Sequence, residues 1–324
     1  MPERILITGG AGLIGLATTR QLAAAGHELV VLDLPEQVDR AGHLLPDGVA
    51  AIPGTILDAP LLRDAIAGCS AIVHLAARLG VRRTEADKLG CLRVNIDGTA
   101  TVLDAAIDAG VKRIVFASSS EVYGEPLHNP ITERDITQGK TVYAVTKLAG
   151  EELCHAFAQR HGIEAVVLRY FNCYGPNQVA QFVVPKWVWE VEHGRRPIVN
   201  GDGSQVRSYT FVDDTAAATA AAVTHPDAPG KTLNISNGSE PVSLLELADR
   251  VIAAAGQTGT ITPDVRADFA GTDRAKEREI DHRFCHGELA QQTLDWTPQV
   301  SLDDGLQRMV AAMRAGELWE DWAA

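Results

Sequence analysis

The chain has 324 residues, of which 46% are hydrophobic and 22% charged, and this composition is typical of a globular protein of about two domains. Its 29 basic and 42 acidic residues give a net charge of −13, which argues against a nucleic-acid-binding protein because such proteins need a basic face. No apolar run approaches the ~20 residues that cross a bilayer, so we expect no membrane partner.

The first half of the chain alternates short apolar runs with longer amphipathic ones, the pattern of a parallel sheet covered by helices. Six strands are predicted, at Arg4–Thr8, Glu28–Leu32, Val49–Pro53, Ala71–Leu75, Arg113–Ala117 and Ala165–Leu168. Four helices are predicted between them, at Gly12–Ala25, Pro60–Ala67, Cys91–Ala109 and Thr141–His161. The predicted fold class is therefore α/β, with a doubly wound parallel sheet of the Rossmann type over residues 1–170.

After Tyr170 the sequence becomes rich in turns, and helices are predicted at Val183–His193, Asp213–Thr224, Leu244–Ala255 and Leu302–Ala315. This half, residues 171–324, is predicted to form a smaller mixed α/β substrate-binding lobe over the carboxyl ends of the sheet. Residues 205–235 are expected to return in part to the first domain, since Asp213–Thr224 and Thr232–Ile235 supply one further helix and strand.

A glycine-rich loop joins the first strand to the first helix, and it predicts a dinucleotide site. Gly9 permits the tight turn, Gly12 lets a pyrophosphate approach the backbone, and Gly15 lets the helix pack close to the sheet. Leu13 and Ile14 belong to the same loop, at a helix N-terminus that favours negative charge. A plain turn is the alternative.

Three polar residues follow later strands. Asp33 ends the second strand, where a carboxylate would accept the adenosine ribose hydroxyls and repel a 2′-phosphate, so NAD is favoured over NADP. Asp58 would accept from the adenine amino group or cap a helix before Pro60. A core or strand-end role is favoured for His74 over a catalytic one.

Tyr143 and Lys147 lie four residues apart, so a helix places both on one face. A serine cluster, Ser118 to Ser120, ends the fifth strand, at the edge where ligands bind in such sheets. A tyrosine with a pKa of about 10 is a poor base, but a neighbouring ammonium and a positive nicotinamide both favour its phenolate. Tyr143 would then take a hydroxyl proton while a hydride leaves the same carbon for NAD. A surface Tyr–Lys pair is the alternative.

Seven motifs occur in an order that resembles one family: TGGAGLIG from Thr8, the acid Asp33, HLAA from His74, VNIDGT from Val94, SSSEVYG from Ser118, YAVTK from Tyr143 and RYFNCYGP from Arg169. The chain is similar to the extended short-chain dehydrogenase/reductase family of nucleotide-sugar epimerases and dehydratases. The resemblance implies a tightly held NAD that is reduced and reoxidised in each turnover. It also implies a nucleoside-diphosphate sugar as substrate.

The resemblance also implies residue roles. Ser119 would bind the reacting sugar hydroxyl, Tyr143 would be the base and Lys147 would hold the nicotinamide ribose. Further residues on the cofactor side are Leu75, Ala76, Ala77, Asn95 and Tyr170. The substrate would contact Arg82, Asn172, Val184, Arg207 and Arg274, with Arg207 neutralising the diphosphate. A surface salt bridge from Arg207 to Asp202 or Asp213, and a solvated face for Arg274, are the alternatives. No metal site is predicted.

Ser120 and Glu121 bear on the reaction. Related dehydratases carry Asp where this chain has Ser120, so the usual general acid for 4,6-dehydration is absent. Related decarboxylases and many epimerases carry Glu at position 121. We therefore expect a 4-epimerase that acts through a 4-keto sugar, with a uronate decarboxylase or an unusual dehydratase using Glu121 as the alternative. Arg82 and Arg83 would meet a uronate carboxylate, or be exposed basic residues on a loop.

The nucleotide base and the assembly are less defined. Asn200 stands where relatives carry an aromatic residue to stack on a pyrimidine, and UDP is the first expectation. A non-catalytic NAD-binding sensor is a remote alternative, because such relatives usually lose the Tyr or Lys. The resemblance suggests a homodimer through the helices near Cys91–Ala109 and Thr141–His161. Five scattered cysteines and a first strand at Arg4 favour a cytoplasmic protein with reduced thiols and no signal peptide.

Overall fold

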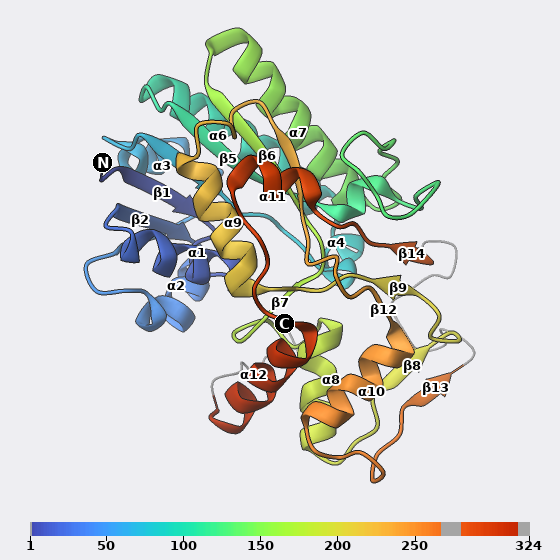
Figure 1. Cartoon of the computed structure of the whole chain (residues 1–324). Coiled ribbons are helices and arrows are strands. Elements are labelled where there is room, and N and C mark those ends of the chain that lie inside the picture. The colour runs from blue at the N-terminus through green and yellow to red at the C-terminus, as the bar shows by residue number, and fades with distance from the viewer. Residues whose placement is uncertain (1, 267–279, 317–324) are drawn as a thin grey trace.

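The computed structural model of the chain describes residues 2–266 and 280–316 (Figure 1). A seven-stranded parallel sheet is its centre, in the order β11-β6-β5-β4-β1-β2-β3. The strands are β1 (Arg4–Thr8), β2 (Glu28–Asp33), β3 (Ala50–Pro53), β4 (Ala71–His74), β5 (Arg113–Ser119), β6 (Glu164–Tyr170) and β11 (Thr232–Ile235). The order reverses between β1 and β4, which is the point where doubly wound sheets bind ligands.

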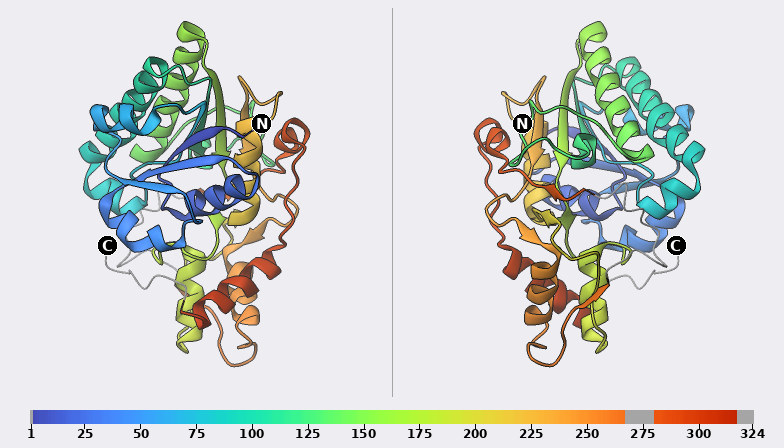
Figure 2. Two further views of the ribbon diagram at one scale, coloured as in Figure 1. Left: turned by 90° about the vertical axis from the view of Figure 1, so that its left-hand side faces the viewer. Right: turned by 90° about the vertical axis from the view of Figure 1, so that its right-hand side faces the viewer.

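Helices cover both faces of this sheet (Figure 2). One face carries α3 (Ala59–Ile66), α6 (Gly98–Asp108) and α7 (Val142–His161). The other carries α1 (Leu13–Ala24), α9 (Val212–Thr224) and α11 (Glu288–Leu294). The central strands are apolar on both sides, since Leu6 packs into one core while Ile5 and Ile7 pack into the other.

The six strands predicted for the first half are present, and β11 is the seventh. β11 pairs in parallel with β6, so Thr232–Ile235 lies in the main sheet, and α9 packs against α1 beside it. Arg113 at the start of β5 holds the end of α9, because its guanidinium donates to the main-chain oxygens of Val223 and His225 at 2.7 and 2.9 Å. The chain therefore crosses between the two halves more than once.

The helix predicted at Cys91–Ala109 is interrupted. The structure has α5 (Lys88–Leu92), then a π-helical segment η2 (Arg93–Asp97), and then α6. Such wide turns occur often at functional sites because they re-aim a side chain, and here the segment carries Asn95 inward. The structure also has α2 (Pro35–Ala41), α4 (Val81–Ala86), α11 and the 3-10 helices η1 (Gly42–Leu44) and η3 (Ser120–Tyr123), which were not predicted.

The smaller lobe packs α8 (Val183–Glu192), α10 (Leu244–Ala254) and α12 (Leu302–Arg314) around an apolar core. Short strands form two small separate sheets: β7 (Cys173–Tyr174) pairs with β10 (Thr210–Phe211), and β8 (Ile198–Asn200) with β13 (Asp264–Arg266). A further sheet has β9 (Val206–Arg207) between β12 (Val242–Ser243) and β14 (His282–Arg283). The lobe lies below the main sheet in Figure 1. Within the described residues no helix is long and apolar enough to span a membrane.

Candidate active site

The glycine loop leaves room for a ligand only at Gly12. A Cβ at Gly15 would overlap the main-chain oxygen of Gly9, and one at Gly9, whose φ is +72°, would lie 2.7 Å from Ala76 N. A Cβ at Gly12 would meet only the oxygen of Gly9, at 3.3 Å. The α1 N-terminus has neither a side-chain cap nor an acidic residue in its first turn. Its free amides and its dipole therefore fit a dinucleotide pyrophosphate.

Asp33 reaches back to this loop from the end of β2. Its carboxylate accepts hydrogen bonds from Ala11 N at 3.0 Å and from Leu34 N at 2.8 Å. Burial raises the pKa of Asp33, while these two amides act against that rise. Asp58 caps α3, because its carboxylate accepts a hydrogen bond from Leu61 N at 3.1 Å. The structure therefore shows the helix-capping role, which was the alternative to an adenine contact. Ribose and adenine contacts for these acids stay predictions.

His74 and Asn95 are buried structural groups beside the cofactor loop. The His74 ring bonds to the hydroxyls of Thr8 at 2.7 Å and Thr99 at 3.0 Å, and burial, aided by the charge of Lys147, lowers its pKa to about 3. His74 is thus neutral, in line with the core role favoured from the sequence. Asn95 accepts from Arg78 N at 2.7 Å and donates to the hydroxyl of Thr146 at 3.0 Å.

That bond network ties the loop after β4, which contains Leu75, Ala76 and Ala77, to helix α7. Tyr170, the last residue of β6, is also buried, and its hydroxyl bonds to that of Thr219 on α9 at 2.9 Å. The Tyr170 hydroxyl is therefore already engaged within the chain. Cofactor contacts from these residues stay predictions.

Ser119, Tyr143 and Lys147 come together where β5 meets the start of α7. Ser119 lies close enough to Tyr143 to lower the pKa of its phenol. Lys147 is only 3% exposed, and its Nζ donates to Ala117 O at 2.7 Å and lies 5.7 Å from the centre of the Tyr143 ring. The alternative of a surface Tyr–Lys pair is therefore wrong, because the chain buries the ammonium completely.

The electrostatics of this pair differ from the expectation in one respect. Burial raises the pKa of Tyr143, and the nearby Glu121 raises it further, while Ser119 lowers it. Burial also lowers the pKa of Lys147 to about 8. The neighbouring ammonium does not make Tyr143 a phenolate in the chain alone, because desolvation opposes both charges.

Glu121 lies between the serine cluster and the start of α7. Its Oε2 accepts from the Thr141 hydroxyl at 3.1 Å, and the same Thr141 oxygen caps α7 by accepting from Ala144 N at 3.1 Å. The Ser120 side chain is buried within η3. Glu121 is thus held beside Tyr143 by the helix cap, and Thr141 is a site residue that the sequence reasoning missed.

The predicted diphosphate residue Arg207 is buried, so the alternative of a surface salt bridge is wrong. Its guanidinium donates to the main-chain oxygens of Val206 at 2.8 Å and Asp281 at 3.1 Å. Arg283, which was not predicted as a site residue, is paired with it, because β14 pairs with β9 in a register that matches the two arginines. Both side chains are 9% exposed.

The other predicted substrate residues are scattered. Asn172 is partly buried, has a φ of +36° and donates from Nδ2 to Ser208 O at 2.8 Å. The Val184 side chain is in the core of the smaller lobe, so the structure gives it a packing role. Arg82 and Arg83 belong to helix α4. The expectation that they lie on a loop is therefore wrong. Arg274 lies outside the described residues.

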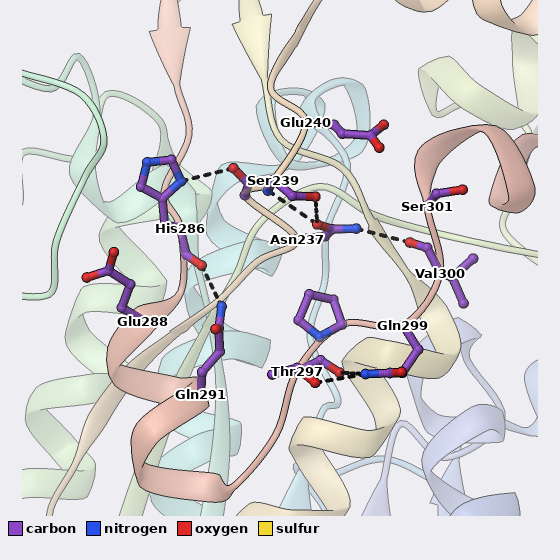
Figure 3. Close-up of a pocket in the computed structure, with 12 residues that line it drawn as sticks. Asn237, Ser239, Glu240, His286, Glu288, Gln291, Thr297, Gln299, Val300 and Ser301 are labelled. Atoms are coloured by element: carbon purple, nitrogen blue, oxygen red, sulfur yellow. Dashed lines mark hydrogen bonds between the residues drawn. The ribbon is translucent and has the colours of Figure 1, made fainter.

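A separate hollow of about 500 Å³ lies between α11 and the start of α12 (Figure 3). Its polar groups are largely bonded to one another. Asn237 donates to Val300 O at 3.0 Å, His286 bonds to Gly238 O at 2.9 Å, and Gln291 donates to His286 O at 2.9 Å. None of the predicted catalytic residues lines it. Among the described residues no group of three acidic, His or Cys side chains could hold a metal.

Comparison with known proteins identifies the family. A model of the NAD dependent epimerase/dehydratase family matches residues 5–236. The chain belongs to this family. A dTDP-glucose 4,6-dehydratase of Streptomyces griseus is 33% identical, over 98% of this chain and 96% of the relative. A UDP-N-acetyl-alpha-D-glucosaminuronate decarboxylase of Bacillus cytotoxicus is 31% identical, over 97% of this chain and 98% of the relative.

The fold agrees with this assignment. The structure of a UDP-glucose 4-epimerase of Thermus thermophilus in complex with NAD is similar, with a TM-score of 0.84 and 28% identity, over 96% of this chain and 99% of that one. As a member of the epimerase/dehydratase family, this protein is an enzyme that uses NAD and acts in nucleotide-sugar chemistry. Its relatives divide among epimerases, dehydratases and decarboxylases.

Proposed function

We propose that the protein is an NAD-dependent nucleotide-sugar 4-epimerase that acts through a transient 4-keto sugar. The observation that carries this proposal is the buried Lys147 ammonium, 5.7 Å from the centre of the Tyr143 ring, with Ser119 near the phenol and Ser120 in place of an acid. Epimerisation needs one base and one hydroxyl anchor. It needs no additional acid to expel a leaving group.

In this proposal Ser119 binds the 4-hydroxyl of the sugar and Tyr143 moves its proton. NAD, when bound, supplies the oxidation of the sugar carbon and its reversal. Lys147 is a fixed positive charge beside the phenol ring that favours the phenolate once the site is assembled. Tyr143 returns the proton to the oxygen after the ketone has turned, so neither the chain nor the sugar loses atoms.

The cofactor would be held by the glycine loop, with Gly12 and the α1 amides at the pyrophosphate and Asp33 at the adenosine ribose. Lys147 would also donate to the nicotinamide ribose, and Leu75, Ala76, Ala77 and Asn95 would line that side of the cofactor. Asp58 would contact the adenine, and the ring of Tyr170 would complete the cofactor site. The open approach at Gly12 supports this placement.

The diphosphate would bind at the paired arginines of β9 and β14. The register of β9 and β14 pairs these two arginines, and a diphosphate is an anion whose oxygens match the planar geometry of a guanidinium group. Asn172 would add a contact from the turn after β6. Arg82 is proposed to contact the sugar, and Arg274 is proposed to contact the diphosphate. UDP is the proposed nucleotide, because several relatives are named for UDP-sugars.

A second candidate is decarboxylation of a UDP-uronate, or an unusual dehydration, with Glu121 as the acid–base group. The position of Glu121 beside Tyr143 favours this alternative, since a carboxylate there is near the reacting sugar. The decarboxylase relative shows that the family contains such chemistry. The two candidates differ in whether Glu121 is needed for turnover.

A panel of UDP-, dTDP-, GDP- and CDP-sugars that includes UDP-glucuronate separates the candidates by mass and proton NMR. Epimerisation leaves the mass unchanged and alters the coupling of the 4-proton. Loss of carbon dioxide or of water from the sugar would instead establish decarboxylation or dehydration. Binding of NAD with no product from any sugar would favour a sensor and overturn the proposal.

We also propose a homodimer formed through α6 and α7. Apolar side chains are exposed on this part of the molecule, with Leu89 on α5 at 79% and Val145 on α7 at 48%. A second copy would cover them. Light scattering of the protein and of a Val145→Lys variant tests this, because a dimer in both would exclude an interface at Val145.

A further inference from the structure

Three successive turns of α7 face three residues at the end of β5. Lys147 Nζ donates to Ala117 O and the Ser118 hydroxyl donates to Glu151, while Ser119 lies close enough to Tyr143 to lower the pKa of its phenol. The spacing of four residues puts all three on the face of the helix that meets the sheet. The bonds of Lys147 and Glu151, one and two turns after Tyr143, therefore fix how α7 lies along β5.

The bond between Glu151 and Ser118 is part of a buried ion pair. Both carboxylate oxygens of Glu151 accept from Arg169 on β6, from Nε at 2.9 Å and from Nη2 at 2.6 Å. The two side chains are only 4% and 8% exposed. Such bidentate arginine–carboxylate pairs have a defined geometry, and the loss of one partner leaves a buried charge without compensation.

The same arginine also holds the other side of the site. Its Nη1 donates to the Tyr123 hydroxyl at 2.8 Å, and Tyr123 donates to Asn234 Oδ1 on β11 at 2.7 Å. Tyr123 ends η3, the short helix that follows Ser119 and carries Glu121. Arg169 thus links the segment with the serine to the helix with the tyrosine.

We propose that the buried Glu151–Arg169 pair positions Tyr143 against Ser119, and that Glu151 is a positioning residue of the active site. The inference rests on the proposed function, in which these two side chains meet the sugar hydroxyl. A slip of α7 by one residue moves each side chain by about 1.5 Å along the axis and about 100° around it. Misplacement of a reacting group by about 1 Å reduces rates about 100-fold.

The test uses Glu151→Gln and Ser118→Ala in the NAD-loaded protein. Glu151→Gln keeps the shape but leaves the Arg169 charge uncompensated, and we expect kcat to fall at least 10-fold. Ser118→Ala removes only the bond to the strand, and we expect kcat to fall about threefold to tenfold. The KM for the nucleotide sugar and the Kd for NAD should change less than twofold, because neither residue is placed at either ligand.

Asp214→Asn is the matched control for loss of stability. Asp214 is also a buried carboxylate, on α9 at the opposite face of the sheet, and it accepts from Gln299 N and Val300 N. We expect this variant to melt at a lower temperature and keep its kcat. A kcat loss in Glu151→Gln no larger than in an equally destabilised Asp214→Asn would overturn the proposal. If Glu151→Gln fails to fold, full kcat in Ser118→Ala would overturn it.

A crystal structure of the variants separates this inference from the proposed function. In the Glu151→Gln protein, or in Ser118→Ala if the former does not fold, the Tyr143 side chain should be displaced relative to Ser119 from its position in the unmodified protein. An unmoved tyrosine would contradict positioning, whichever sugar the enzyme uses. Absence of turnover in the unmodified protein, by contrast, would contradict the proposed function alone.

Discussion

The Nζ of Lys147 lies 2.7 Å from the main-chain oxygen of Ala117, where β5 reaches the edge of the sheet. This bond fixes the ammonium 5.7 Å from the centre of the Tyr143 ring. At that distance the charge of Lys147 acts on the phenol. The roles of the two residues can therefore be separated by substitution.

Tyr143→Phe should abolish turnover and leave NAD bound. The change removes the phenol hydroxyl but keeps the ring, so we expect the packing of α7 to be unaffected. General-base groups contribute about 10²–10⁴-fold, and we expect kcat to fall at least 100-fold. Turnover on the preferred nucleotide sugar and bound NAD content measure this. Undiminished turnover would remove Tyr143 from the mechanism.

Gly12→Ala and Gly15→Ala should fail in different ways. A methyl group at Gly12 meets only Gly9 O and otherwise projects into open space, so this variant should fold normally but bind NAD at least 10-fold more weakly. A methyl group at Gly15 overlaps the backbone of Gly9 and Gly10, so this variant should lose stability. Calorimetric NAD titration and melting curves distinguish the two. Equal NAD affinity in Gly12→Ala and the unmodified chain would place the pyrophosphate elsewhere.

Lys147 should make the free energy of unfolding depend on pH in the alkaline range. Burial lowers its pKa from 10.5 to about 8, so between these values the unfolded chain binds more protons than the folded one. The cost of burying the ammonium is fully present below pH 8 and disappears as the pH rises to 10.5. Near pH 7 that cost is at most about 3 kcal/mol.

Lys147→Met has no such charge, so we expect its free energy of unfolding to exceed that of the unmodified protein at pH 7. This margin, the difference between the two free energies of unfolding, should be smaller at pH 10. The groups near the ammonium, Tyr143, Glu151, Cys91 and Cys154, are present in both proteins, so the comparison isolates the charge of Lys147 and its interactions with them. Denaturant unfolding at both pH values, at equal cofactor content, gives the margin. A margin that stays constant with pH would show that Lys147 is not buried in its charged form.

The sequence was most informative where a local pattern determines structure. Strands β1 to β6 were predicted because buried parallel strands are continuous apolar runs, and the glycine loop because its spacing has a mechanical cause. The pairing of Tyr143 with Lys147 follows from helical periodicity alone. The family resemblance then indicated the cofactor and the class of substrate.

What the sequence could not supply depends on contacts between distant segments. Arg283 meets Arg207 through two strands of two residues each, which leave no periodic signal. Glu151 and Arg169 are charged residues in a helix and a strand, and only the tertiary fold buries them together. Val184 was assigned to the substrate, although an apolar residue on an amphipathic helix is more often in the core, as it is here.

The central claim is that this enzyme inverts the sugar 4-position through a ketone. A UDP-sugar that carries deuterium at C4 tests it most directly, since oxidation and reduction at that carbon must give the epimer with the deuterium still at C4. We predict an epimeric product of unchanged mass, read by mass spectrometry and NMR. Loss of the deuterium to solvent, or a product lighter by carbon dioxide or water, would contradict the claim.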